Sequence, residues 1–472
     1  MFLLPEIALS LVLLLVLYHG VPALVQCTHP AKALAPQTIQ NGLLLVYSWG
    51  LFACIAPAFL LLLLIYTLVA VCAFKFVSPA KPVHQAVIGG AWVSLCVGVL
   101  FAVKYYNPVR EFVAAQWPGF AAMPALNLVL GFSVSFLTFQ FITLAVLWWR
   151  GALTPQQSPA QLAIYIAFFP TLAAGPITRA QQLLPQLSQA RTMIAPRYAL
   201  ARILLGVWQM LVCAQWLAET WVNPIYAAPQ NHHGLEVLAA VLAYSLQIYL
   251  DFSGLSNIVV GLGWLLGIRL PRNFRSPYAA VNIRDFWRRW HISLSLWIRD
   301  YLYKPLGGNR KGFARAQLAV VASMGLSGVW HGAALTFVAW AGMHIAAVML
   351  MNTLDRTKRS WVLPKGLGMA LTFAWVSLAW VFFRADNLDH ALAIFAAIVN
   401  TKVLIQYNVI GFGVLVLAFF ILQSRAARWS QTLMARLNQL PMWAFALWVL
   451  VSLYFAIELG PQGVPNFIYA GF

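Results

Sequence analysis

The chain has 472 residues, of which 62% are hydrophobic and 9% charged, with a net charge of +19. A soluble domain carries about a quarter charged residues, so a soluble globular protein is excluded, and apolar runs that are continuous rather than alternating exclude a membrane β-barrel. The basic residues lie in short segments between apolar runs, which the positive-inside rule explains better than binding to nucleic acid. The sequence therefore predicts an all-α polytopic membrane protein with no nucleic-acid partner.

The apolar runs give the expected number of membrane helices. They lie at about residues 2–25, 42–74, 86–104, 125–149, 160–175, 200–222, 235–268, 316–350, 367–384, 390–400, 408–423 and 441–459. Because about 20 apolar residues cross the hydrocarbon core, we expect roughly ten to twelve helices in a single integral membrane domain, residues 1–472. The first run is expected to be a retained helix, since no Lys or Arg precedes it as in a signal peptide. The run that contains Pro57 predicts either one long tilted helix or two pieces.

Two of these runs contain helix-breaking residues. Residues 160–175 include Phe169-Pro170 and end at Gly175-Pro176. Residues 316–350 contain four glycines around two histidines: Gly325, Gly328, Gly332 and Gly342. Breaks inside apolar sequence are typical of re-entrant or interrupted helices that line a cavity.

The segment from Asn282 to Lys311 is too charged to span a membrane. Eleven of the thirty basic residues fall between Arg269 and Arg315, against two acidic ones, which predicts that this part of the chain faces the cytoplasm. Aromatic residues alternate here with arginines, as in RDFWRRWH, and the pattern is typical of an amphipathic helix on a membrane surface. Arginine and tryptophan anchors at the lipid boundary would explain it without any catalytic role.

His331 is the strongest candidate for a chemical role from the residues alone. No Lys, Arg, Asp or Glu occurs between Arg315 and Asp355, and an ionisable group in such a run is a functional candidate by default. A neutral imidazole could accept a proton from an attacking hydroxyl or thiol, and the flanking Gly328 and Gly332 would let a substrate approach closely. The alternative is a histidine hydrogen-bonded between helices. His344 is interpreted as a packing residue.

Other polar residues are less specific. Asp251 stands among apolar residues. Its position fits a catalytic role and fits equally well a structural salt bridge to one of the basic residues between Arg269 and Arg315. His232 and His233 lie in a polar loop with no third ligand nearby, and the five cysteines have no CxxC spacing, so no metal site is expected. Nucleotide-binding, serine hydrolase and dinucleotide motifs are absent from the sequence, and no bound cofactor is expected.

The motifs taken together resemble a known family. RDFWRRWHISLSLWIRDYLYKPLGGNR, followed by SGVWHGAALTFVAW, is similar to the membrane-bound O-acyltransferase superfamily, in particular to the bacterial branch that serves acetylation of envelope polymers. FFPTLAAGPITR, SLQIYLDFSG, NFRSPY and VFFRADNLDHAL match further pieces in family order. The resemblance covers residues 130–395 as a core, whereas residues 1–120 match poorly and residues 396–472 supply C-terminal helices.

This resemblance implies a fold and a set of site residues. The fold is a ring of membrane helices around a thinner centre. His331 of the WHG motif would be catalytic and His291 of the RRWH motif would be the second site residue, with Asp251 and Trp330 in support. The remaining expected residues would contact the donor or its entrance: Arg288, Arg289, Trp290 and Asn309. Arginines there suit the phosphate groups of a thioester donor.

The resemblance also implies a function. The chain would move an acyl group, most simply acetyl from acetyl-CoA, across the bacterial inner membrane for O-acetylation of an extracytoplasmic polymer. A carrier protein is the other possible donor, with D-alanyl transfer as the corresponding reaction. Expected partners are membrane lipid and a separate periplasmic or surface acyltransferase. From another class, a proton-coupled polysaccharide or lipid transporter could use His331 and Asp251 as proton relays.

Overall fold

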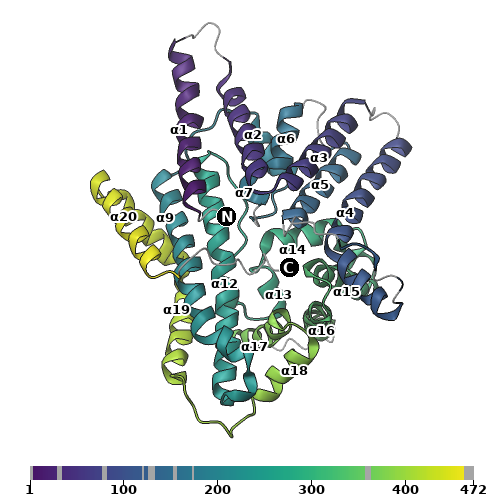
Figure 1. Ribbon diagram of the computed structural model, residues 1–472, viewed down its shortest axis with the longest axis vertical. Coiled ribbons are helices and arrows are strands. Elements are labelled where there is room, and N and C mark those ends of the chain that lie inside the picture. Colours follow the sequence, from purple (N-terminus) through teal and green to yellow (C-terminus); the bar gives the residue numbers. More distant parts are fainter. Residues whose placement is uncertain are drawn as a thin grey trace. The chain divides into compact units, whose positions relative to one another are not determined.

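The computed structural model describes most of the chain. The described residues are 4–28, 34–76, 82–117, 119, 122–125, 133–152, 157–172, 175–356 and 363–461. Over these residues the regular structure is helical and contains no strand (Figure 1). The expectation of an all-α polytopic membrane protein is confirmed, because nine helical spans in the described ranges are long and apolar enough to cross a bilayer.

Those spans and the shorter helices have the following bounds. The long ones are α1 (Pro5–Thr28), α2 (Pro36–Ile55), α3 (Pro57–Phe76), α4 (Pro82–Gln116), the helical stretch from α9 (Pro196–Val207) to α11 (Asn223–Ala227), α12 (Gly234–Leu265), α16 (Leu335–Arg356), α17 (Lys365–Arg384) and α19 (Val409–Gln439). Shorter apolar helices are α5 (Ser133–Trp149), α6 (Pro159–Ala167) with α7 (Phe169–Leu172), α18 (Leu388–Ala397) and α20 (Met442–Glu458).

Helix breaks occur where the sequence places proline or glycine. The run around Pro57 forms two helices, α2 and α3, separated at Ala56, because proline cannot donate the hydrogen bond that would continue the first. The run from residue 160 is interrupted at Phe168, just before Pro170. The run from residue 316 is interrupted after His331, where α15 (Phe313–His331) ends. The predicted interrupted helices are therefore confirmed.

The described chain forms two compact units. The first contains the residues up to Ile203 together with Ser256–Pro271, and the second contains Leu204–Leu255 and the residues from Arg272 onward. In the first unit the guanidinium of Arg191 is buried and donates hydrogen bonds to the hydroxyl of Tyr18 and to Oδ1 of Asn41. Among the described residues no carboxylate pairs with Arg191, so these bonds are what satisfies the buried charge.

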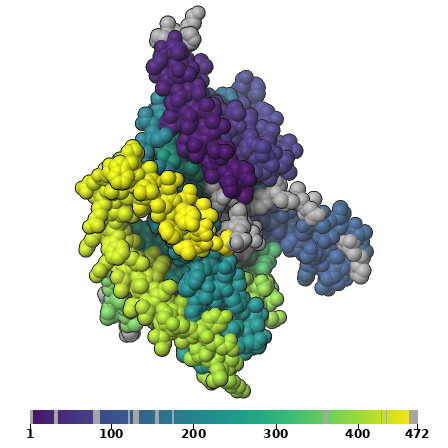
Figure 2. Space-filling model, turned by 60° about the vertical axis from the view of Figure 1, so that its left-hand side comes forward, coloured from purple at the N-terminus to yellow at the C-terminus, as the bar shows by residue number. Residues whose placement is uncertain are grey.

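The second unit contains the candidate site. Its core is aromatic: Trp290, Trp380 and Tyr278 are each at most 2% exposed. The outer helices α19 and α20 run along one face of the unit, as the yellow-green and yellow ridge in Figure 2 shows. They expose apolar side chains such as Ile410 and Trp443, which are 80% and 72% exposed. Such a surface suits contact with lipid.

The segment from Asn282 to Lys311 differs from its prediction. It contains two short helices, α13 (Ile283–Trp287) and α14 (Ile292–Ile298), joined by a sharp turn. The expectation of one amphipathic surface helix is wrong, because Phe286 and Trp290 are buried in the core of the unit rather than turned toward lipid. The turn between α13 and α14 lets both rings be buried, and the free energy gained by that burial favours the turn over one continuous helix.

Candidate functional site

His331 ends α15 and is surrounded by aromatic rings. Its side chain is buried, with the residue 4% exposed. The imidazole centroid lies 4.7 Å from the ring of Trp330, 5.0 Å from Phe383, 5.2 Å from Trp340 and 6.1 Å from Phe337. Residues from α15, α16 and α17 thus fix the ring in one place.

The glycines beside His331 have a different role from the one expected. A Cβ at Gly328 would lie 2.7 Å from Cβ of Ala341 and 2.8 Å from the carbonyl oxygen of Phe337. A Cβ at Gly332 would lie 2.5 Å from the ring of Phe337. The idea that these glycines leave room for substrate is wrong, because residues of α16 occupy the space. The glycines instead allow α15 and α16 to pack closely.

His291 occupies the turn between α13 and α14 with a left-handed backbone conformation. Its φ is 40°, which is uncommon for a residue other than glycine. The turn is held by a neighbouring loop: the amide of Ile292 donates to the carbonyl of Asn273 at 2.8 Å, and Ser293 Oγ donates to Asn273 Oδ1 at 2.6 Å. The motifs NFRSPY and RRWH are therefore one structural unit, which places the His291 ring 4.7 Å from that of Phe252.

Burial determines the protonation state of His291. The residue is 1% exposed and lies outside the helices that are long enough to span the membrane. Desolvation of the charged form lowers the pKa of His291 to about 3. The imidazole is therefore neutral at physiological pH.

The basic residues next to His291 point in different directions. Arg288 is exposed and lines a cavity described below. Arg289 pairs with Asp285, its Nε lying 2.9 Å from Oδ2. Trp290 is 2% exposed and packs against Trp380 in the aromatic core. Asp251, also predicted, is buried on α12 next to Phe252, the residue that contacts His291.

A cavity of about 360 Å³ opens between α13, α14, α15 and α16. Its buried wall includes Trp340 and His344, which are 2% and 0% exposed. Its rim carries three arginines: Arg284, Arg288 and Arg299. An apolar pocket with a few convergent polar groups is typical of a small-molecule site, and a basic rim suits an anionic ligand.

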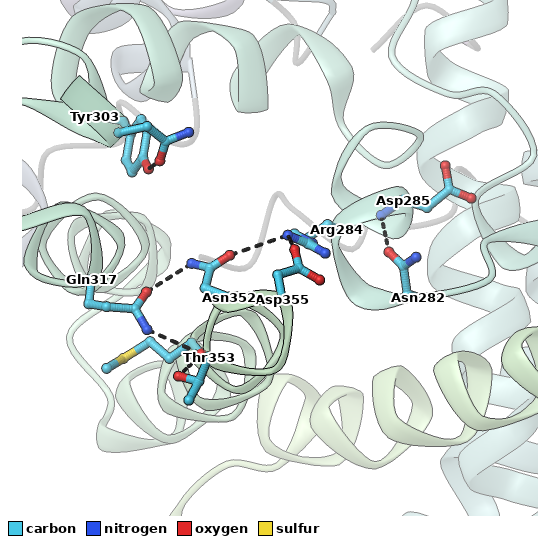
Figure 3. A network of polar contacts seen from close by, with 10 residues as sticks. Asn282, Arg284, Asp285, Tyr303, Gln317, Asn352, Thr353 and Asp355 are labelled. Atoms are coloured by element: carbon cyan, nitrogen blue, oxygen red, sulfur yellow. Dashed lines mark hydrogen bonds and ion pairs between the residues drawn. The ribbon is translucent and has the colours of Figure 1, made fainter. Parts of the chain in front are cut away.

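Two of the rim arginines have acidic partners. Arg284 Nη1 lies 2.5 Å from Asp355 Oδ2 and also donates to Asn352, as Figure 3 shows. Arg299 Nε lies 2.9 Å from Asp300 Oδ1. Among the residues that the structure describes, no carboxylate lies within ion-pair distance of Arg288. The charge of Arg288 is therefore the one most available to a ligand phosphate.

Tyr303 completes the rim and is fixed by Asn309. The Tyr303 hydroxyl donates to Asn309 Oδ1 at 2.6 Å. Tyr303 and Arg284 both line the cavity, and Figure 3 shows them apart from each other. Asn309 itself is exposed and is not among the lining residues. The LGGNR motif thus acts on the cavity through Tyr303.

Trp340 connects the cavity to His331. One face of α15 lines the cavity with Val320, Met324 and Ser327, and His331 follows Ser327 by one helical turn on the same face. The Trp340 side chain belongs to the cavity wall and also contacts the His331 ring. A ligand in the cavity would therefore lie one side chain away from His331.

The described contacts do not join the two predicted histidines directly. His331 contacts rings from α15, α16 and α17, whereas His291 contacts Phe252 of α12. In the described part of the chain, no group of three His, Cys, Asp or Glu side chains is arranged to hold a metal ion.

Several lining residues were not predicted: Arg284, Trp287, Trp340 and His344. Arg284 precedes Arg288 by four positions, and His344 follows Trp340 by four, which places each pair on one helical face. That spacing was a usable signal. Which partner helix those faces meet depends on long-range packing.

The chain is similar in sequence to a known family and to several named proteins. Residues 152–364 match the family described as MBOAT, membrane-bound O-acyltransferase family. The chain is 33% identical over 353 residues to "Probable alginate O-acetylase AlgI" of Pseudomonas aeruginosa, covering 72% of this chain and 67% of that protein. It is 36% identical over 317 residues to the protein of the same name from Pseudomonas putida, covering 65% of this chain and 64% of that protein, less than two thirds of its length.

A relative with another substrate in its name also matches. "Peptidoglycan O-acetyltransferase" of Helicobacter pylori is 36% identical over 244 residues, covering 50% of this chain and 46% of that protein. These three relatives share O-acetyl transfer in their names and differ in the polymer.

Proposed function

Because the chain belongs to the membrane-bound O-acyltransferase family, we propose that it is an O-acyltransferase that takes an acetyl group from a cytoplasmic thioester donor. The acetyl group passes through the membrane and is used for O-acetylation of an extracytoplasmic polysaccharide or envelope polymer. Transfer as a small neutral group avoids moving the charged donor through hydrocarbon.

The observation that carries this proposal is the cavity next to His331. Its basic rim suits the phosphate groups of CoA or of a phosphopantetheine arm, and its apolar wall suits the chain that follows them. Trp340 belongs both to that wall and to the surroundings of His331. A donor bound with its phosphates at Arg288 would therefore direct its thioester toward His331.

The chemistry at His331 is acyl transfer. In the simplest route the neutral imidazole accepts the proton of an incoming hydroxyl while that oxygen attacks the thioester carbonyl. The carbon–sulfur bond then breaks, and the departing thiolate takes the proton from His331. In the other route the imidazole itself attacks the thioester carbonyl, the carbon–sulfur bond breaks, and the departing thiolate takes the ring proton, which leaves an acyl-imidazole. The hydroxyl then attacks the acyl carbon, the carbon–nitrogen bond breaks, and the imidazole takes the hydroxyl proton. Mass spectrometry of acid-quenched protein separates the two routes, because only the second leaves an acetyl group on His331.

The basic rim suggests an orientation in the bacterial inner membrane. Segments rich in Arg and Lys remain on the cytoplasmic side, so the cavity would open to the cytoplasm, where acyl thioesters are made. The polymer lies on the other side. A separate periplasmic or surface acyltransferase would then receive the acetyl group and modify the polymer.

The deciding experiment uses the purified protein in sealed vesicles with radiolabelled acetyl-CoA on the side of the basic rim. Acyl transfer predicts that label reaches a small hydroxyl acceptor enclosed on the opposite side without any proton gradient. A proton-coupled transporter would instead leave the acceptor unlabelled and would respond to an imposed gradient. Unlabelled acceptor with correctly folded protein contradicts the proposed reaction.

A further inference from the structure

His344 is a buried polar residue that the proposed chemistry does not use. It is 0% exposed, lies on the cavity-facing side of α16 and lines the cavity wall. Among the described residues, neither Nδ1 nor Nε2 of His344 has a hydrogen-bond partner. Buried polar groups are nearly always hydrogen-bonded, so packing alone does not explain a histidine here.

The surroundings of His344 fix its orientation without satisfying it. Its ring is edge-on to Trp287 and Trp340, with centroid distances of 4.9 Å and 5.0 Å, and is stacked 6.1 Å from Phe286. These rings restrict the imidazole to one position. A neutral imidazole carries one N–H donor and one nitrogen acceptor, and no described residue of the protein uses either of them.

We propose that His344 binds the donor through hydrogen bonds to an amide of its pantetheine arm. This inference rests on the proposed function. Each amide of the arm offers a carbonyl that can accept from the imidazole N–H, or an N–H that can donate to the other ring nitrogen. The methylene groups between the amides suit the apolar faces of Trp287 and Trp340, and the phosphate end of the arm suits Arg288 at the rim.

The same arm occurs in two donors, CoA and a phosphopantetheine-bearing carrier protein. His344 would serve both, because both share the amides. The rest of each donor lies beyond the cavity rim. Measuring CoA and an acetylated carrier protein side by side therefore distinguishes the source while testing the same contact.

His344→Phe is the most informative substitution. It keeps an aromatic ring against Trp287 and Trp340 but removes both nitrogens. If His344 were only a packing residue, the variant would bind CoA as well as the wild type, because the phenylalanine ring would keep the same packing contacts. If His344 binds the arm, the Kd for CoA rises about tenfold for each hydrogen bond lost.

The full chain is used throughout, with three variants and one control. CoA binding is measured by thermal shift and by titration, and donor KM and kcat by acetyl transfer. His344→Gln retains one donor and one acceptor and should recover part of the affinity, and His344→Leu decides the question if the phenylalanine protein does not fold. Ser377→Ala is the matched control. Ser377 lies on α17 outside the cavity lining, and its buried hydroxyl has no hydrogen-bond partner among the described residues.

Each result has a definite meaning. A raised KM with little change in kcat, loss of the CoA thermal shift and partial recovery by His344→Gln support donor binding by His344. An unchanged Kd, or a lowered kcat at unchanged KM, in a folded apolar variant overturns it. If the wild-type protein itself shows neither a thermal shift with CoA nor acetyl transfer, the proposed function fails. If the wild-type protein responds to CoA and His344→Phe responds equally, only the role of His344 fails.

Discussion

His331 and His344 contact the same indole ring, that of Trp340, at centroid distances of 5.2 Å and 5.0 Å. The two histidines lie on different helices and are separated by the interruption after His331. Because Trp340 also belongs to the cavity wall, this ring lies between the proposed donor site and the proposed site of transfer. Both ends of the reaction path therefore depend on the position of one side chain.

His331→Ala should abolish acyl transfer. A positioned imidazole accelerates such a reaction by a factor of about 10²–10⁴, so the rate of the variant should be at least about 100-fold below that of the wild type. The measurement is labelled acetyl transfer in sealed vesicles, normalised to the amount of folded protein. His390→Ala is the control, because that histidine is on α18 and contacts the backbone of Tyr226 rather than the cavity. Activity within a few-fold of wild type would contradict the catalytic role.

Arg288 and Arg289 should differ although they are adjacent. Arg288→Ala removes a rim charge that lacks an acidic partner in the described structure, so the donor KM should rise several-fold with a smaller change in kcat. Arg289→Ala breaks an ion pair with Asp285 and should leave the donor KM near the wild-type value. Steady-state kinetics over a range of donor concentrations distinguishes them. Equal effects on KM would contradict the assignment of Arg288 to the donor.

Gly328→Ala should destabilise the protein. The new Cβ would lie 2.7 Å from that of Ala341, so α15 and α16 would have to separate, at a cost of about 1–3 kcal/mol. Gly325→Ala on the same helix meets nothing within 4 Å and should stabilise by about 0.5–1 kcal/mol. Thermal unfolding of the two variants in one detergent provides the comparison. Similar Tm values would show that the helices adjust without cost.

His291 should make the protein less stable in acid. Its pKa is about 3 in the folded protein, whereas an exposed histidine in the unfolded chain titrates near pH 6.5. Between these values the unfolded chain binds a proton that the folded one does not, so the free energy of unfolding decreases as pH falls from about 6.5 toward 3. His291→Asn tolerates the same backbone and lacks the titration. Its Tm should therefore fall less than that of wild type between pH 7 and pH 5, and an equal decrease would assign the acid sensitivity to other groups.

The purified protein should not modify a polymer by itself. A cavity of about 360 Å³ can hold part of a small donor but not a polysaccharide chain. With acetyl-CoA and polymer alone, mass spectrometry should find no acetylated sugar, and acetylation should begin when the separate extracytoplasmic acyltransferase is added. Direct acetylation of the polymer by the pure protein would show that one component is enough.

Local sequence predicted the helices well because their signals are local. Apolar length gave the membrane spans, and the breaks near Pro170 and Gly332 followed from the backbone preferences of proline and glycine. The run containing Pro57 could not be assigned to one helix or two from length alone. The structure divides it at Ala56.

The site was predicted only in part because much of it depends on packing between distant segments. Intramembrane polarity singled out His331, but the rings that enclose it include Phe383, more than 50 residues away. His344 lies in the same run and is interpreted from the sequence as a packing residue. Its nitrogens lack a hydrogen-bond partner among the described residues, and this emerges only when α13 and α16 are placed together. The alternation of arginine and tryptophan around His291 suggested a lipid boundary, whereas the tryptophan at position 290 belongs to the core.

The left-handed backbone at His291 limits which residues the position can accept. A φ of 40° suits glycine and asparagine and excludes β-branched residues, whatever their chemistry. Saturation mutagenesis at position 291 would therefore separate the requirement of the backbone from that of the imidazole. Glycine and asparagine would preserve the expressed amount of protein. Histidine alone would preserve both expression and any function of the imidazole. Variants evolved for stability alone should accumulate asparagine at this position, because it suits the backbone and fills part of the buried space that glycine would leave empty, and they should lose whatever chemistry the ring provides.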